Sequence, residues 1–284
     1  MVRYFILLLS LLGAVGICLL FGGFCGSQWL WLLPVGFAVS FLVIALAVFL
    51  TLWVSCLLVS VEKKQEKDSP YYRWLTGFIA TVALWILRMR VHTKGLEKLP
   101  KDGRFLLVSN HIHDLDPVLL MSVFKKRQLA FISKRENDQK PFVAELMHKT
   151  MCQLINREND REALKTILNC IRLLQEDEVS VAVFPEGYTS LDGLLHPFRH
   201  GVFKIAQKAK VPIVVCVLRD TNKPFQNIKT LKHTDVYLHI LTVLQPEDFA
   251  GITAVELGTR IHTMMAEELG PELVLPQGEQ DEED

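Results

Sequence analysis

Two long apolar runs open the chain and set it apart from everything that follows. Residues 5–24 (FILLLSLLGAVGICLLFGGF) and residues 30–59 contain no charged side chain. A helix needs about 20 apolar residues to cross a bilayer, so each run is long enough to span. The uncharged segment between them, residues 25–28 (CGSQ), is short and is followed by tryptophans, which favour the membrane interface. The pattern predicts a transmembrane helical hairpin over residues 1–60, with both of its ends on one side.

Positive charges flank this hairpin. Arg3 precedes the first run, and a basic cluster follows the second, at Lys63, Lys64, Lys67 and Arg73. Because cytoplasmic flanks of membrane helices are enriched in Lys and Arg, we expect a multi-pass membrane protein whose remaining chain is cytoplasmic. The alternative for the first run is a signal peptide, but the run exceeds the usual apolar length, no Ala-x-Ala site follows, and a second span comes immediately after.

A third apolar stretch, residues 74–87 (WLTGFIATVALWIL), is too short to cross a bilayer comfortably. Its large side chains recur at helical spacing, at Trp74, Phe78, Val82 and Trp85. This spacing predicts an amphipathic helix with a broad apolar face. Two interpretations stay open: the helix packs on the core of the following domain, or it lies in the membrane interface.

From residue 104 onward, short β-rich runs alternate with longer helical patterns. The expected strands are residues 105–109, 129–133, 179–184, 211–218 and 236–244, and the expected helices are residues 117–124, 141–151, 161–175 and 201–210. This alternation predicts an α/β domain over residues 101–266, with a central, largely parallel sheet flanked by helices. In such sheets the ligand site lies beyond the carboxyl ends of the strands.

Charge is distributed unevenly, although the 284 residues carry 31 basic and 31 acidic side chains. Residues 61–150 hold 17 basic and 10 acidic side chains, and residues 267–284 hold eight acidic and no basic ones. We expect residues 61–100 to form a basic linker and interfacial helix close to an anionic membrane surface. The end of the acidic tail, from Glu279, is expected to be disordered. The composition excludes a polytopic transporter and a wholly disordered chain, and membrane phospholipids, not nucleic acid, are the expected partners.

A polar segment follows the first expected strand of the domain. Residues 110–117 (NHIHDLDP) place two imidazoles and two carboxylates at the end of an apolar strand. His111 and Asp116 are five residues apart, so they meet only if the intervening loop folds back. Asp116 would then hold one imidazole nitrogen and leave the other free as a general base. Asp116 before Pro117 also predicts a helix N-cap with proline in the first turn.

Two further segments carry candidate chemistry. Residues 184–190 (FPEGYTS) follow the third expected strand, and Gly187 would let the backbone approach a ligand closely. Asn156 and Arg157 follow a short apolar pair, where the arginine offers a fork suited to phosphate.

Taken in order, these segments resemble the motifs of the membrane glycerolipid acyltransferases, specifically the 1-acyl-glycerol-3-phosphate acyltransferase family. His111 and Asp116 match the family's His-x4-Asp motif. The other matching blocks are residues 154–157 (LINR), residues 184–187 (FPEG) and residues 211–214 (VPIV), and Lys134 and the Gly-x-Phe of residues 201–203 also agree. The resemblance covers about residues 75–250.

The resemblance implies transfer of a fatty acyl group from acyl-CoA or acyl carrier protein to the hydroxyl of a lysophospholipid, 1-acyl-glycerol-3-phosphate, giving phosphatidic acid. His111 would remove the hydroxyl proton and Asp116 would orient the imidazole. No cofactor and no metal are implied. The implied substrate-binding residues are Arg157, which would contact the phosphate, with Lys134, Glu186, Gly187 and Ser190. A carboxylate repels phosphate, so Glu186 is expected to fix an Arg or Lys, or a glycerol hydroxyl.

The chain departs from the family after the FPEG block. The family usually has Thr-Arg-Ser there, whereas this chain has Tyr188, Thr189 and Ser190, and Asn156 replaces a common aspartate. These changes affect the implied phosphate site and leave His111 and Asp116 intact. Another lysolipid or a glycerol phosphate therefore remains an alternative acceptor.

Two alternatives of other classes stay open. The alternation of His111, His113, Asp114 and Asp116 is also typical of metal-dependent hydrolases, although the remaining histidines are dispersed and the six cysteines include no C-x-x-C pair. The altered position at Thr189 would also fit a non-catalytic lipid-binding membrane protein.

Overall fold

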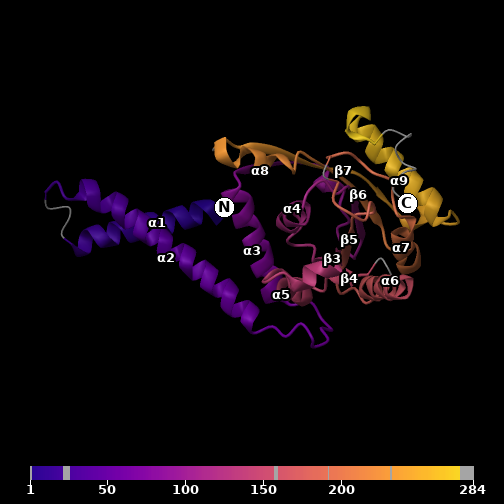
Figure 1. Ribbon diagram of the computed structural model, residues 1–284, viewed down its shortest axis with the longest axis horizontal. Helices are drawn as coiled ribbons and strands as arrows, with labels where there is room; N and C mark the ends of the chain where they lie inside the picture. Colours follow the sequence, from indigo (N-terminus) through magenta and orange to yellow (C-terminus); the bar gives the residue numbers. More distant parts are fainter. Residues whose placement is uncertain (1, 22–25, 157–158, 191, 231, 276–284) are drawn as a thin grey trace. The chain divides into compact units, whose positions relative to one another are not determined.

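The structure is a computed structural model that describes residues 2–21, 26–156, 159–190, 192–230 and 232–275 (Figure 1). The chain divides into two units, Met1–Glu62 and Lys63–Asp284. Arg157 and the last nine residues of the expected acidic tail lie outside the described residues.

The first unit consists of two helices, α1 (Val2–Leu20) and α2 (Trp29–Leu57). Both helices are long and apolar enough to cross a bilayer, as the sequence predicted. They pack closely where a Cβ added at Gly36 would lie 3.2 Å from the Ala14 Cα atom. Most of their large apolar side chains are exposed, so the hairpin surface suits contact with lipid.

The second unit is built on a seven-stranded sheet with the order β1-β7-β6-β2-β5-β3-β4. Every neighbouring pair is parallel except β6 and β7, so the prediction of a largely parallel sheet is confirmed. The strands are β1 (Met89–Lys94), β2 (Leu106–Ser109), β3 (Leu129–Lys134), β4 (Gln153–Ile155), β5 (Ser180–Val183), β6 (Ile213–Arg219) and β7 (Thr234–Leu244).

Helices cover both faces of this sheet (Figure 1). Along β2, Leu106 and Val108 face one core and Leu107 faces the other, as the two-residue period of a strand requires. The first core receives α6 (Asp160–Gln175), α7 (Lys204–Ala209) and α9 (Ala254–Leu269), and the second receives α3 (Pro70–Ile86) and α4 (Asp116–Val123). The remaining α-helices of this unit are α5 (Val143–Lys149) and α8 (Lys223–Asn227).

Helix α3 corresponds to the third apolar stretch and combines features of both interpretations. Leu75, Ala80 and Leu84 are buried, so one side packs on the domain. Trp74 and Ile86 are 60% and 64% exposed on the remaining surface. The helix therefore packs on the core of the domain with one side and exposes large apolar side chains on the other.

Strands β1 and β4 and helices α8 and α9 were not predicted. Strand β1 (MRVHTK) is mostly polar and lies at the sheet edge, and β4 has only three residues, so neither carries a strong strand pattern. Helix α9 follows the last expected strand and buries Leu257, Ile261 and Met265 against β6 and β7.

Candidate active site

The loop after β2 folds back on itself and brings His111 and Asp116 together. The His111 Nδ1 atom lies 2.9 Å from Asp116 Oδ2, and the Asp116 side chain is fully buried. The same oxygen accepts hydrogen bonds from the backbone N–H groups of Ile112 (2.7 Å) and His113 (2.8 Å). Asp116 thus fixes the loop and the imidazole at once.

The expectation that Asp116 caps α4 is wrong. The helix begins at Asp116 itself, Leu115 occupies the cap position, and no side chain caps this end. The Asp116 carboxylate instead turns back to the loop, because donors from three loop residues converge on its Oδ2 atom.

The second imidazole nitrogen of His111 faces a hydroxyl group. Because Nδ1 donates to Asp116, Nε2 carries the lone pair of the neutral ring. Thr189 Oγ1 lies 3.1 Å from Nε2 and 3.3 Å from Asp114 Oδ1. The ring stacks on Phe184 with a centroid distance of 4.1 Å. The arrangement orients a base toward an oxygen atom at hydrogen-bonding distance.

Glu186 is 1% exposed and supports the loops instead of reaching outward. Its Oε1 atom accepts from the His111 N–H (2.7 Å), and its Oε2 atom accepts from the His196 N–H (3.1 Å). Burial raises the pKa of Glu186 to about 8, although the two amide hydrogen bonds oppose this shift. Both carboxylate oxygens bond backbone amides, so the expected contact with an Arg or Lys side chain is not found among the described residues.

Gly187 has a φ of +88°, which favours glycine, and a Cβ added there would lie 2.9 Å from the Cδ and Nε atoms of Arg199. Arg199 therefore lies directly over the FPEG turn, and its backbone N–H donates to the Pro185 carbonyl at 2.7 Å. Its side chain is exposed, and within the described part of the chain its guanidinium forms no hydrogen bond or ion pair. Arg199 was not among the predicted site residues, although only His200 separates it from the Gly-x-Phe segment at residues 201–203.

Ser190 also supports the His111 loop. It is buried, and both its N–H (2.8 Å) and its hydroxyl (3.1 Å) donate to the His111 carbonyl. Nearby, Tyr188 Oη lies 2.8 Å from His196 Nδ1, and His196 Nε2 lies 2.9 Å from Asp192. These contacts, which order the segment after FPEG, were not predicted from the sequence.

Lys134 ends β3 and is exposed, in register with Ile155 of β4. Because β3 and β5 are parallel neighbours, Lys134 lies at the same edge of the sheet as the FPEG turn. The phosphate role of Arg157 stays a prediction, since that residue lies outside the described part of the chain. The preceding Asn156 donates from its carboxamide to Glu162 at 3.0 Å.

Among the described residues, no group of three or more His, Cys, Asp or Glu side chains is arranged to hold a metal ion. His113 Nδ1 accepts from the Leu115 N–H, and Asp114 Oδ1 lies 3.3 Å from Thr189 Oγ1. The side chains that suggested a metal-dependent hydrolase therefore contact groups of their own loop and of the FPEG segment.

Comparison with known proteins identifies the family. A family model described as Acyltransferase matches residues 90–219. A 1-acyl-sn-glycerol-3-phosphate acyltransferase of Borreliella burgdorferi is 27% identical over 160 residues, which span 56% of this chain and 63% of that protein. One of Chlamydomonas reinhardtii is 31% identical over 242 residues, 84% of this chain and 69% of that protein. The chain belongs to the 1-acyl-sn-glycerol-3-phosphate acyltransferase family.

A solved structure of the same family supports the fold. The 1-acyl-sn-glycerophosphate (LPA) acyltransferase PlsC of Thermotoga maritima superposes with a TM-score of 0.59 at 23% identity, covering 95% of this chain and 98% of that one. The segment matched by the family model contains both the His111 loop and the FPEG turn. The site described above thus lies in the part of the chain that defines the family.

Proposed function

We propose that this membrane acyltransferase transfers a fatty acyl group from an acyl thioester to the hydroxyl of 1-acyl-glycerol-3-phosphate, giving phosphatidic acid. The observation that carries the proposal is the buried Asp116 carboxylate that holds His111 with Nε2 directed at a hydroxyl oxygen 3.1 Å away. This is the geometry that a general base needs to take a proton from an attacking alcohol.

In the proposed reaction, the acceptor hydroxyl replaces Thr189 Oγ1 opposite His111 Nε2. The hydroxyl oxygen attacks the thioester carbonyl while Nε2 takes its proton, and Asp116 stabilises the imidazolium that forms. A C–O bond forms and the C–S bond breaks, and the imidazolium returns the proton to the departing thiolate. The step needs no metal, no cofactor and no covalent intermediate.

The acceptor phosphate would bind to cations at the carboxyl edge of the sheet. Lys134 ends β3, and Arg199 lies over Gly187 with its guanidinium exposed and unpaired within the described residues. Arg157 is the third candidate. Glu186 and Ser190 would act indirectly, by holding the backbone of His111 in place.

We also propose that α1 and α2 cross the membrane as a hairpin and that the catalytic unit is cytoplasmic, because basic residues flank both ends of the hairpin. This arrangement would hold the domain against the bilayer that supplies its acceptor.

The test is an assay of the purified full chain with a panel of acceptors and two donors, acyl-CoA and acyl carrier protein. We expect the highest kcat/KM with 1-acyl-glycerol-3-phosphate, and weaker use of lysolipids whose phosphate is esterified, because these lose charge-assisted hydrogen bonds to the cations. Equal use of uncharged monoacylglycerol would contradict a phosphate site. Absence of transfer with every acceptor and donor would contradict the proposed function itself.

A further inference from the structure

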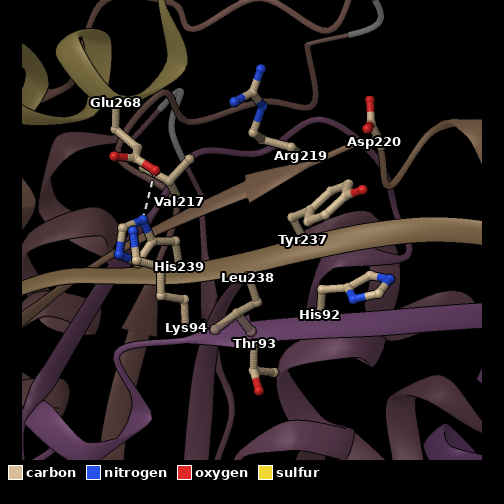
Figure 2. A pocket seen from close by; sticks show the side chains of 10 residues that line it. All are labelled: His92, Thr93, Lys94, Val217, Arg219, Asp220, Tyr237, Leu238, His239 and Glu268. Carbon is tan, nitrogen blue, oxygen red and sulfur yellow. Dashed lines mark hydrogen bonds and ion pairs between the residues drawn. The ribbon is translucent and has the colours of Figure 1, made fainter.

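A cavity of about 400 Å³, shown in Figure 2, opens on the sheet face that carries α9, and its lining contains no residue of the FPEG turn. Its floor is formed by three neighbouring strands, β6, β7 and β1. Glu268, in the last turn of α9, reaches into it and contacts His239, as the dashed line in Figure 2 marks. The reaction proposed above does not use this cavity.

The strand register places the cavity's side chains in two rows on one face. Arg219 of β6 pairs with Tyr237 of β7, and Tyr237 pairs with His92 of β1. Two residues along, the corresponding row contains Val217, His239 and Lys94. Because residues two apart point to the same face, the charged and aromatic side chains converge on one space.

The acidic side chains of this region are already paired. Glu268 contacts His239 at 2.6 Å, Asp220 contacts Lys223 at 2.7 Å, and Asp235 contacts His92 at 2.7 Å. The side chains of Lys94 and Arg219, by contrast, form no hydrogen bond or ion pair with any residue that the structure describes. The cavity is therefore lined by two cations without a direct partner, while its two carboxylates, Asp220 and Glu268, are paired with Lys223 and His239.

An aromatic surface lies between these cations. Tyr237 is 43% exposed, and its ring stacks with that of His92 at a centroid distance of 5.1 Å and an interplanar angle of 22°. Flat rings of this kind stack on nucleobases, and Lys and Arg side chains bind phosphate groups. Unpaired cations beside an exposed ring suit a phosphorylated nucleotide better than a lipid chain or an acidic peptide.

Hydrogen bonds between Asn110 and Leu218 of β6 connect the cavity to the catalytic loop. The Asn110 carboxamide accepts from the Leu218 N–H (2.8 Å) and donates to the Leu218 carbonyl (3.0 Å). The next residue of each segment, His111 and Arg219, is therefore held in fixed relation to the other. From β2 to β1 there are three strand-to-strand steps, or about 15 Å in all. A pantetheine arm that separates a thioester from its nucleotide covers a distance of this order.

We propose that this cavity binds the 3′-phosphorylated nucleotide end of an acyl-CoA donor, with Lys94 and Arg219 as phosphate partners and Tyr237 as the stacking surface. The inference rests on the proposed acyl transfer and names its donor as a coenzyme A thioester. Binding there leaves the pantetheine arm to carry the thioester toward His111.

The test compares Lys94→Ala and Arg219→Ala with the control Lys208→Ala, an exposed lysine on α7 that does not line the cavity. Lys94 and Arg219 have no described partner, so their removal leaves no group unpaired and the variants should fold. Calorimetry with the purified full chain measures the affinity for free CoA. We expect each cavity variant to weaken binding about tenfold, the loss of one charge-assisted contact, and the control to bind like the wild type.

Two further ligands test which part of CoA the cavity binds. Dephospho-CoA lacks the 3′-phosphate and should bind the wild type more weakly, with a smaller loss in the variants. Acyl-pantetheine lacks the nucleotide, so both variants should use it as well as the wild type does, whereas their KM for acyl-CoA should rise. Unchanged CoA affinity in both variants would overturn the assignment.

The outcomes separate this inference from the proposed function. If the wild type transfers acyl groups only from acyl carrier protein and does not bind CoA, the cavity assignment fails and the acyltransferase function stands. If the wild type transfers from no donor, the proposed function fails. CoA binding that depends on Lys94 and Arg219 would then still support the nucleotide site.

Discussion

At the scale of single residues, the account depends on which atoms surround His111 Nε2. Thr189 supplies the hydroxyl opposite this nitrogen, and Asp116 holds the other nitrogen. The three side chains have the hydrogen-bonding order of a catalytic triad, so a covalent route through Thr189 is a specific alternative to direct transfer.

We predict that Thr189→Val keeps acyl transfer within a few-fold of the wild-type rate. In direct transfer the acceptor hydroxyl takes the place of Thr189 Oγ1, so the side-chain hydroxyl is dispensable. Mass spectrometry of the intact wild-type protein with acyl-CoA and no acceptor should accordingly show no acyl adduct. An adduct on the wild type, lost in Thr189→Val together with the activity, would instead establish Thr189 as a nucleophile.

At the scale of elements, the site consists of two loops at the ends of β2 and β5, connected by Glu186 and covered by Arg199. Glu186 bonds the backbone of both loops, and Gly187 lets the Arg199 side chain approach the FPEG turn. Substitutions at these positions should therefore displace the His111 imidazole, although none of them alters that side chain or its contact with Asp116.

Gly187→Ala should lower both stability and activity. Its φ of +88° strains any side chain, at a cost of about 1 kcal/mol or more, and the new Cβ would lie 2.9 Å from Arg199. Gly201→Ala is the matched control, because no atom lies within 4 Å of its added Cβ. Thermal unfolding and initial rates of the two variants give the comparison, and equal behaviour of both would contradict the proposed packing of the turn.

Glu186 should make stability depend on pH. Its pKa is about 8 in the folded protein, above the ordinary value of 4.5, so the folded state binds more protons than the unfolded state between these values. Stability from this group is therefore present at low pH and lost as the pH rises toward 8. The melting temperature of the wild type should fall across this window, and Glu186→Gln should flatten the fall.

The control for this experiment is Glu256→Gln. Glu256 is an exposed carboxylate whose pKa is lowered by hydrogen bonds from Thr253, so it is ionised throughout the window and its substitution should leave the slope unchanged. Identical slopes for the wild type and Glu186→Gln would show that the buried carboxyl does not titrate there.

The pattern of apolar and polar residues along the sequence predicted most of the helices and strands. The buried strands β2 and β5 are continuous apolar runs, and the His111 and Asp116 contact was expected if the loop folded back. Strand β1 could not be predicted from its pattern, because its His92 and Lys94 suit an exposed sheet edge and also suit a loop. The positions of Arg199 and Glu186 depend on contacts between distant segments, which the residue pattern of one segment does not contain.

At the scale of the whole molecule, the chain combines two apolar helices with an α/β catalytic unit. The helices are long enough to span a bilayer, and the hairpin places both of its ends at the same surface if both cross. The proposed acceptor is a membrane lipid, so a spanning hairpin would keep the catalytic unit at the surface that supplies it.

Sidedness can be tested by labelling. In a variant whose six native cysteines are replaced by alanine, we expect a cysteine introduced at Glu97, an exposed position in the second unit, to react with a membrane-impermeant reagent only from the cytoplasmic side, because basic residues flank the hairpin there. A cysteine at Ser27, between the two helices, should react only from the opposite side. Labelling of both positions from one side would contradict a spanning hairpin.

The most direct measurement compares acyl transfer to 1-acyl-glycerol-3-phosphate by His111→Ala and His113→Ala. Both histidines lie in the same loop, but only His111 bonds Asp116 through its ring and faces Thr189. The account predicts that His111→Ala loses activity by about 10²-fold or more, as expected for a general base, whereas His113→Ala retains most of it. Wild-type activity in His111→Ala, with the protein folded and inserted, would contradict the mechanism.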